Sequence, residues 1–216
     1  LTAHFDHLGV TTPIEGDSVN NGASDNAAGV SALLEMMEAY QSVQPLLKRS
    51  VLAVIVSAEE VGLLGSQYWA ENPTVDPGKV TANINLDGMN VYGETKAEKQ
   101  GRTVKPDPYP ERGYFYRSDH FNMAKVGIPA IFPNPGTEYI GKGENFLALR
   151  DSVADANYHT VSDEINEFWD LNGAEIDTRL FFLTGFRALN AEELQTWKRG
   201  DEFEATRLEM LERVEN

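Results

Sequence analysis

The sequence predicts an α/β fold in which helices flank a mostly parallel β-sheet. Short apolar runs alternate with longer stretches of helical spacing, which is typical of strands joined by crossover helices. Residues 51–56 are apolar throughout and rich in β-branched side chains, so we expect a central strand buried on both faces. Across residues 26–40 apolar side chains recur at helical spacing, and Ser24 and Asp25 are placed to cap that helix.

The remaining elements continue this alternation. Further strands are expected at residues 1–5, 80–86 and 128–132. Further helices are expected at residues 65–71, 119–125, 165–189 and 191–214, the last broken near Gly200. Residues 93–112, with three prolines, and residues 133–157 have little periodicity, so both are expected to be irregular loops.

Length and composition fit a single domain over residues 1–216. The chain is 41% hydrophobic and has no segment that resembles a linker. The first motif follows Leu1 almost directly, so we expect the domain to lack its N-terminal part. A net charge of -16 disfavours nucleic acid and anionic membranes as partners and favours cations. No apolar run approaches the ~18 residues of a membrane span, and the oligomeric state is left open.

Polar residues gather where the predicted strands end. The set is His4, Asp6, Asp25, Glu59, Glu60, Asp87 and His159. Because the carboxyl ends of parallel strands form a common crevice, these side chains are expected to converge. Imidazoles and carboxylates that meet in one crevice need cations between them. Nitrogen and oxygen ligands without thiolates suit zinc, and also manganese or cobalt.

The number of candidate ligands favours two divalent metal ions over one. A single catalytic zinc uses three protein ligands, whereas two metals that share a carboxylate can use five. Of the adjacent Glu59 and Glu60, one would then bind metal, and its neighbour would take a proton from water and pass it to the leaving amine. Both can face one crevice only where the strand becomes irregular.

Six segments resemble, in order, the motifs of the co-catalytic di-zinc aminopeptidase family. They are AHFDHLG, NGASDNAAGVSALLEM, SAEEVGLLGSQYWA, NINLDGMN, RSDHFNMAKVGIPAIF and NYHTVSDE. The same family contains glutamate carboxypeptidases, glutaminyl cyclases and the transferrin receptor ectodomain. The resemblance covers residues 1–165, and it implies a three-layer sandwich with a mixed, mostly parallel sheet flanked by helices. It favours a secreted or periplasmic location, although the sequence leaves the compartment open.

The resemblance also implies the ligand set. Asp25 would bridge two metal ions, zinc being the expected metal, and a cis peptide would join it to Asn26. His4 and Asp87 would complete one metal site, and Glu60 and His159 the other.

Further roles follow from the resemblance and from spacing. Glu59 would be the general base, and Tyr158 would stabilise the oxyanion. Arg117 and Asp119 resemble a motif near the amino end of the substrate. Asp6 shares a strand face with His4 and is expected to orient its ring.

Several residues allow a second interpretation. His7 competes with His4 for the first ligand position but is expected to point away, and Asp25 could be only a helix cap. His120 is expected to pack near the crevice rather than bind metal. For Asp163 a capping role is favoured over a role in holding the loop of His159. Tyr114 and its aromatic neighbours could line a specificity pocket or pack in the core.

The expected function is that of a metal-dependent exopeptidase, most simply an aminopeptidase. A hydroxide held between the metals would attack the peptide carbonyl and release the N-terminal residue, with the peptide as the partner. A carboxypeptidase, a dipeptidase or a glutaminyl cyclase of the same family is the alternative. Cyclases typically use one metal and carry tryptophan where this chain has Tyr158. A non-catalytic binding domain is the alternative of another class, although such relatives have replaced ligands and none is replaced here.

Overall fold

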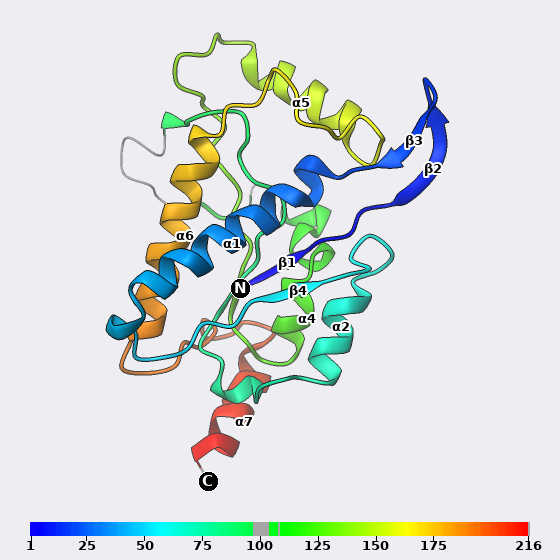
Figure 1. Ribbon diagram of the computed structural model, residues 1–216. Helices are drawn as coiled ribbons and strands as arrows, with labels where there is room; N and C mark the ends of the chain where they lie inside the picture. The colour runs from blue at the N-terminus through cyan, green and yellow to red at the C-terminus, as the bar shows by residue number, and fades with distance from the viewer. Residues whose placement is uncertain (97–103, 108, 216) are drawn as a thin grey trace.

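Four short parallel segments form the centre of the fold in the computed structural model, which describes residues 1–96, 104–107 and 109–215 (Figure 1). Strand β1 (Thr2–His4) pairs with β4 (Val54–Val56), and β5 (Asn83–Ile84) pairs with β6 (Ala130–Ile131). A parallel bridge from Thr2 to Asn85 joins the two pairs. The α/β class is therefore confirmed, and the carboxyl ends of β1, β4 and β5 point to a common edge, as the sequence predicts.

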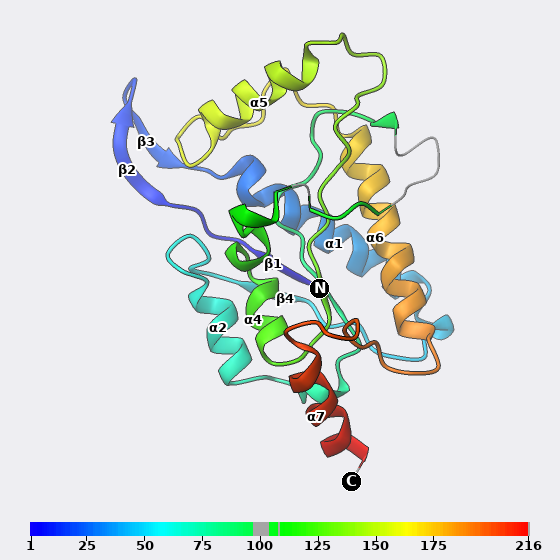
Figure 2. The same cartoon turned by 180° about the vertical axis from the view of Figure 1, so that it is seen from behind.

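Helices pack on both sides of these segments (Figures 1 and 2). The helices are α1 (Ala28–Ser42), α2 (Leu64–Glu71), α4 (His120–Lys125), α5 (Phe146–Asn157), α6 (Asn172–Asn190) and α7 (Glu204–Glu215). Leu33 and Met36 of α1 pack with Phe181 of α6 in one hydrophobic cluster. Trp69 of α2 and Met123 of α4 belong to a second cluster. The three-layer sandwich stays a prediction, because the parallel strands described are only two or three residues long.

The expected burial of residues 51–56 on both faces is wrong. Only β4 is a strand there, and Leu52 and Ile55 are 38% and 40% exposed. Among the described residues β4 pairs with β1 alone, so its other edge and part of one face meet solvent.

Three expected boundaries also change. The region expected to be irregular contains α5, which has no fully buried residue and is less apolar on average than α1. The helix expected at residues 165–189 begins only at Asn172, after Asp170 accepts a hydrogen bond from the Asn172 backbone N–H. The helix expected at residues 191–214 is confined to α7. Arg207 of α7 is fully buried and donates to Gln195 O and Val80 O, which holds the preceding segment in an irregular path.

One element was not expected from the sequence. Strands β2 (Gly9–Ile14) and β3 (Asp17–Asn20) form an antiparallel hairpin that projects beside the start of α1 (Figure 1). Glu15 and Gly16 at its tip both have positive φ, which suits a two-residue hairpin turn. Part of the loop expected at residues 93–112, namely 97–103 and 108, lies outside the described residues.

Candidate metal centre

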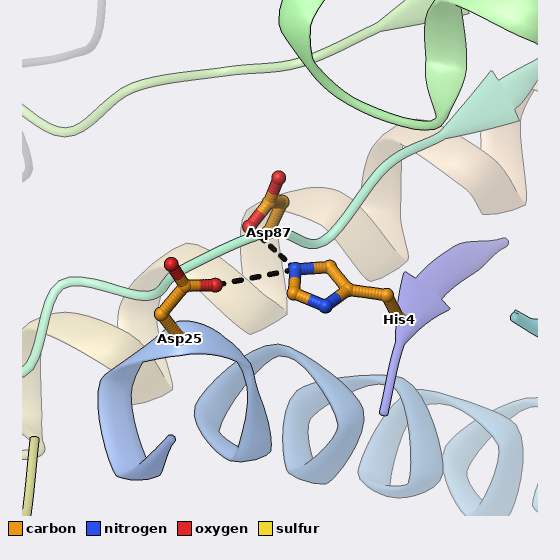
Figure 3. Close-up of side chains that lie close together, drawn as sticks. All are labelled: His4, Asp25 and Asp87. Atoms are coloured by element: carbon orange, nitrogen blue, oxygen red, sulfur yellow. Dashed lines mark hydrogen bonds and ion pairs between the residues drawn. The ribbon is translucent and has the colours of Figure 1, made fainter. Parts of the chain in front are cut away.

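Three side chains from separate elements meet at the carboxyl ends of the parallel strands. His4 ends β1, Asp25 precedes α1, and Asp87 follows β5 (Figure 3). His4 Nε2 lies 3.2 Å from Asp25 Oδ1 and 3.2 Å from Asp87 Oδ1. The side chain of His4 is 1% exposed, so both carboxylates face a buried imidazole. This trio contains the three residues predicted for the first metal site.

A second group surrounds Glu60 and shares Asp25 with the first. Glu60 Oε2 lies 2.8 Å from His159 Nε2, and Asp25 Oδ2 lies 3.5 Å from the same nitrogen. The five side chains predicted as metal ligands are thus brought together, with Asp25 between the two groups. Their roles as ligands remain predictions.

His7 lies in this second group, so the expectation that it points away is wrong. Its Nδ1 is 2.5 Å from Glu60 Oε1, and both side chains are 3% exposed. Strand β1 ends at His4, so the alternation of a strand no longer determines the direction of His7. His7, Asp25 and Glu60 each offer one atom within 4.8 Å of the others.

Near Glu59 and Glu60 the backbone departs from regular strand geometry, as the sequence predicts. Ala58 and Leu63, on either side of Glu59 and Glu60, have φ of 63° and 61°. His159 also has a positive φ, of 57°. Positive φ is uncommon for residues other than glycine and concentrates at functional sites.

Asp6 supports this turn rather than the ring of His4. Its Oδ2 accepts a hydrogen bond from Ala58 N at 2.7 Å. The His4 Nδ1 atom lies 3.0 Å from the backbone oxygen of Asp6, whereas the Asp6 carboxylate is 3.8 Å away. Residue 6 therefore orients His4 through its main chain, and its carboxylate links the ends of β1 and β4 next to Glu59.

The segment that carries Asp25 is held by two residues whose roles the sequence analysis did not predict. The predicted cis peptide between Asp25 and Asn26 is confirmed. The Asp163 carboxylate accepts hydrogen bonds from the backbone N–H groups of Ser24 and Asp25 at 2.9 Å, so its expected role as a helix cap is wrong. Asn26 donates to Leu86 O and accepts from Gly88 N, which links this segment to the loop of Asp87. At the start of α1 (Ala28–Ser42) the Gly29 backbone N–H donates to Asn26 Oδ1, so Asn26 rather than Asp25 caps the first turn.

Ser118 also contacts a predicted ligand and was missed. Its hydroxyl donates to Asp87 Oδ2 at 2.5 Å, and Asn85 donates to the same hydroxyl oxygen at 2.7 Å. The only available signal was its position between Arg117 and Asp119 in the motif. The remaining oxygen of Asp87 faces His4.

Charge and burial shift the pKa values of several groups. Burial opposes protonation of His4, but hydrogen bonds to Asp25 and Asp87 outweigh it and raise the pKa of His4 to about 11. Burial and then the charge of Asp87 raise the pKa of Glu59 to about 8. Burial raises the pKa of Asp119, which is fully buried, to about 6. These shifts reflect an excess of carboxylates in a confined space, an environment that binds cations.

Among the other predicted residues, Tyr158 contacts this centre and Arg117 does not. Tyr158 is 62% exposed and stacks on His159, with the ring centroids 3.7 Å apart. Arg117 is exposed and lies over the ring of Tyr114, so no described contact links it to the two groups. His120 is fully buried against Phe115 and is in neither group, as expected. The aromatic residues pack instead against the C-terminal part of the chain, where Phe115 meets Phe203.

The donor set fits zinc. Imidazole nitrogens and carboxylate oxygens are ordinary zinc ligands, and buried carboxylates in two adjoining groups require positive charge between them. An α/β fold with such a cluster at the carboxyl ends of its strands is typical of metal-dependent hydrolases. The chain matches Peptidase family M28 over residues 1–97 and 89–178, and it belongs to that family.

The relatives carry related names. Aminopeptidase YwaD of Bacillus subtilis (strain 168) is 27% identical over 132 residues, 61% of this chain and 26% of that protein. Leupeptin-inactivating enzyme 1 of Streptomyces exfoliatus is 26% identical over 174 residues, 71% of this chain and 39% of that protein. A probable zinc metalloprotease of Pyrenophora tritici-repentis (strain Pt-1C-BFP) is 33% identical over 95 residues, 44% of this chain and 20% of that protein. The chain thus spans less than half the length of each of these relatives.

The family and the names of the relatives agree with each other. The chain belongs to a family of zinc metallopeptidases, and the relatives it resembles include a named aminopeptidase and a named probable zinc metalloprotease. In the part of the chain that the structure describes, no helix has the length and apolar character needed to cross a bilayer.

Proposed function

We propose that residues 1–216 form the catalytic domain of an aminopeptidase that uses two zinc ions. The observation that carries the proposal is the position of Asp25, whose two carboxylate oxygens face His4 on one side and His159 on the other. A carboxylate with this placement can bridge two cations. His4 and Asp87 would complete one site, and Glu60 and His159 the other. Zinc bound there would supply Lewis acidity and lower the pKa of water.

His7 has a supporting role in this proposal. Its contact with Glu60 Oε1 leaves Oε2 directed at His159. A hydrogen-bonded carboxylate is held in one orientation, as partners of metal ligands commonly are. His7 would therefore position Glu60 rather than bind zinc itself.

Glu59 would move the proton. It lies in the turn between β4 and α2, next to Glu60, and its raised pKa reflects burial among Asp87, Asp119 and Glu60. A carboxylate in that place can accept a proton from the attacking water and deliver it to the nitrogen of the leaving amine. The hydrogen bond from Ala58 N to Asp6 would hold this turn in position.

Tyr158 would assist as a hydrogen-bond donor. Although the Tyr158 side chain is largely exposed, partial burial and the charge of Asp25 raise the pKa of Tyr158 to about 12, so its hydroxyl keeps its proton at neutral pH. A protonated phenol beside the centre can donate to the oxygen on which negative charge develops. Asp119 and Arg117 would lie nearer the amino end of the substrate.

A substrate panel tests the choice among exopeptidases. The zinc-reconstituted protein would be given peptides with a free or acetylated amino terminus and a free or amidated carboxyl terminus, with and without a chelator. Aminopeptidase action requires the free amine and tolerates the amide. Cleavage that requires a free carboxylate would instead indicate a carboxypeptidase or dipeptidase. Release of pyroglutamate from N-terminal glutamine would indicate a cyclase, and zinc-replete protein inactive on the whole panel would favour a binding domain.

A further inference from the structure

A cavity of about 220 Å³ lies beside the proposed zinc site. Asp25, Asp87 and Tyr158 form part of its wall, so a group that enters it is next to the reaction centre. The remaining wall includes the aromatic residues Tyr92, Tyr139 and Trp169 beside polar and small residues. Pockets for drug-sized ligands measure ~300–1,000 Å³, so this smaller cavity suits a single side chain or a chain terminus.

One cation lines this cavity among the described residues. Arg150 belongs to α5, and Ala154 and Asn157 of the same helix also line the cavity. The spacing i, i+4, i+7 turns one face of α5 toward it. The Arg150 guanidinium carbon lies 6.0 Å from the ring centroids of both Tyr92 and Tyr139.

Among the described residues, the anions around Arg150 leave its Nε atom without a hydrogen bond. Its Nε is buried and has no hydrogen-bond partner within the described ranges. The nearest carboxylate oxygen, on Asp151, is 3.2 Å from Nε, but that side chain is 51% exposed. Asp163, also in the cavity wall, is already hydrogen-bonded to Ser24 N and Asp25 N. The Arg150 side chain is 23% exposed, and its Nε has an ion pair with Asp151 but no hydrogen bond to any described residue, so a carboxylate on a substrate would supply the missing acceptor.

We infer that Arg150 selects substrates that place a carboxylate in this cavity. The inference rests on the proposed peptidase function and names its substrate class. The planar guanidinium presents paired N–H donors that match a carboxylate, and the rings of Tyr92 and Tyr139 lie beside it. The carboxylate has two possible sources, the side chain of an N-terminal glutamate or aspartate, and the α-carboxylate of a short peptide.

Two substrate pairs distinguish these sources. Glutamyl and glutaminyl coumarylamides differ only in the side-chain charge and have no α-carboxylate. Leucyl-leucine and its amide differ only at the carboxyl terminus. The zinc-loaded protein is expected to prefer the charged member of one pair by about 10-fold or more in kcat/KM, the scale of a lost charge-assisted hydrogen bond.

Three variants assign the preference to Arg150. Arg150→Gln should bring the preferred pair to a ratio near 1 while cleavage of the neutral member persists. Arg150→Lys should keep part of the preference, because it keeps the charge but loses the paired donors. Arg179→Gln is the matched control, because Arg179 is 75% exposed on α6, and its ratios should equal those of the wild type.

The outcomes separate this inference from the proposed function. Cleavage of neutral substrates with no preference in either pair, or a preference that survives in Arg150→Gln, would overturn the inference alone. A preference for N-terminal lysine or arginine would do the same. If nothing is cleaved, calorimetry with L-glutamate and L-glutaminamide, which lacks both carboxylates, on zinc-loaded protein still decides. Tighter binding of glutamate that Arg150→Gln abolishes supports the inference, and equal binding refutes it.

Discussion

The Nδ1 atom of His7 lies 2.5 Å from Oε1 of Glu60, inside the cluster and not on the outer side of the chain. The other oxygen of Glu60 faces His159. One carboxylate thus contacts two histidines. His159 also forms an ion pair with Asp25 at 3.5 Å, whereas His7 lies within 4.8 Å of Asp25 without one. This asymmetry assigns different tasks to the two histidines, and it can be tested by replacing each in turn.

His159→Gln should leave one zinc ion per chain, because it removes a proposed ligand. His7→Gln should keep two zinc ions but bind them about 10-fold to 100-fold more weakly, the usual effect of losing a group that orients a ligand. Elemental analysis after dialysis against graded chelator measures both variants. Loss of one zinc in His7→Gln and retention of both in His159→Gln would reverse the assignment.

Glu59→Gln should keep its zinc and lose at least about 100-fold in kcat, the scale of a positioned general base. Glutamine has nearly the same shape, but its amide cannot take a proton from water at neutral pH. Metal content and kcat are measured on the same preparation, with Glu15→Gln on the exposed hairpin turn as the control. A zinc-replete Glu59→Gln protein with a near-normal rate would remove Glu59 from the mechanism.

Gly29→Ala should lower the free energy of unfolding by about 1–3 kcal/mol, the range for an overpacked interior. A Cβ atom there would collide with Asn26 Oδ1 and Leu86 O, and Asn26 joins α1 to the loop of Asp87. Gly143→Ala is the control, because a Cβ at that position has no neighbour within 4 Å. Urea unfolding of both variants compares them, and a Gly29→Ala protein as stable as the control would contradict this packing.

Protonation of His120 should make the protein less stable in acid. Burial lowers the pKa of His120 from 6.5 to about 4, so between these values the unfolded chain binds a proton that the folded chain does not. The free energy of unfolding therefore falls as pH decreases from 6.5 to 4, by up to about 3 kcal/mol from this group.

Unfolding of zinc-free wild type and His120→Phe across this range measures the effect without a contribution from metal release. Phenylalanine can keep the packing between Phe115 and Phe132. The variant should lose the part of the pH dependence that His120 supplies. Parallel curves for the two proteins would show that His120 does not titrate in this way.

The convergence of the candidate ligands could be predicted from the sequence because a parallel sheet brings its strand ends to one edge. That rule applies to His4, which ends β1, and to Glu60 and Asp87, which follow β4 and β5. It does not apply to His7, because the strand has ended by then. It also could not identify Ser118 or Asp163, whose roles depend on hydrogen bonds to residues 31 and 139 positions away in the chain.

The fold, too, could be predicted where the local sequence determines the structure and not where tertiary contacts do. Helix α1 has a strong apolar stripe because its inner face packs against β1 and α6, and it was predicted to within two residues at each end. Helix α5 has no fully buried residue and is less apolar on average than α1, and it was mistaken for a loop. The irregular path before α7 depends on the buried Arg207, whose partners include Val80 in a distant part of the chain.

The proposed function depends most directly on how many zinc ions bind around Asp25. Zinc-reconstituted wild-type crystals, measured on both sides of the zinc absorption edge, should show two anomalous peaks, one on each side of Asp25. Their separation should be about 3.5–4 Å, as in other two-metal hydrolytic sites. One peak, or none in protein that has been exposed to excess zinc, would contradict the account.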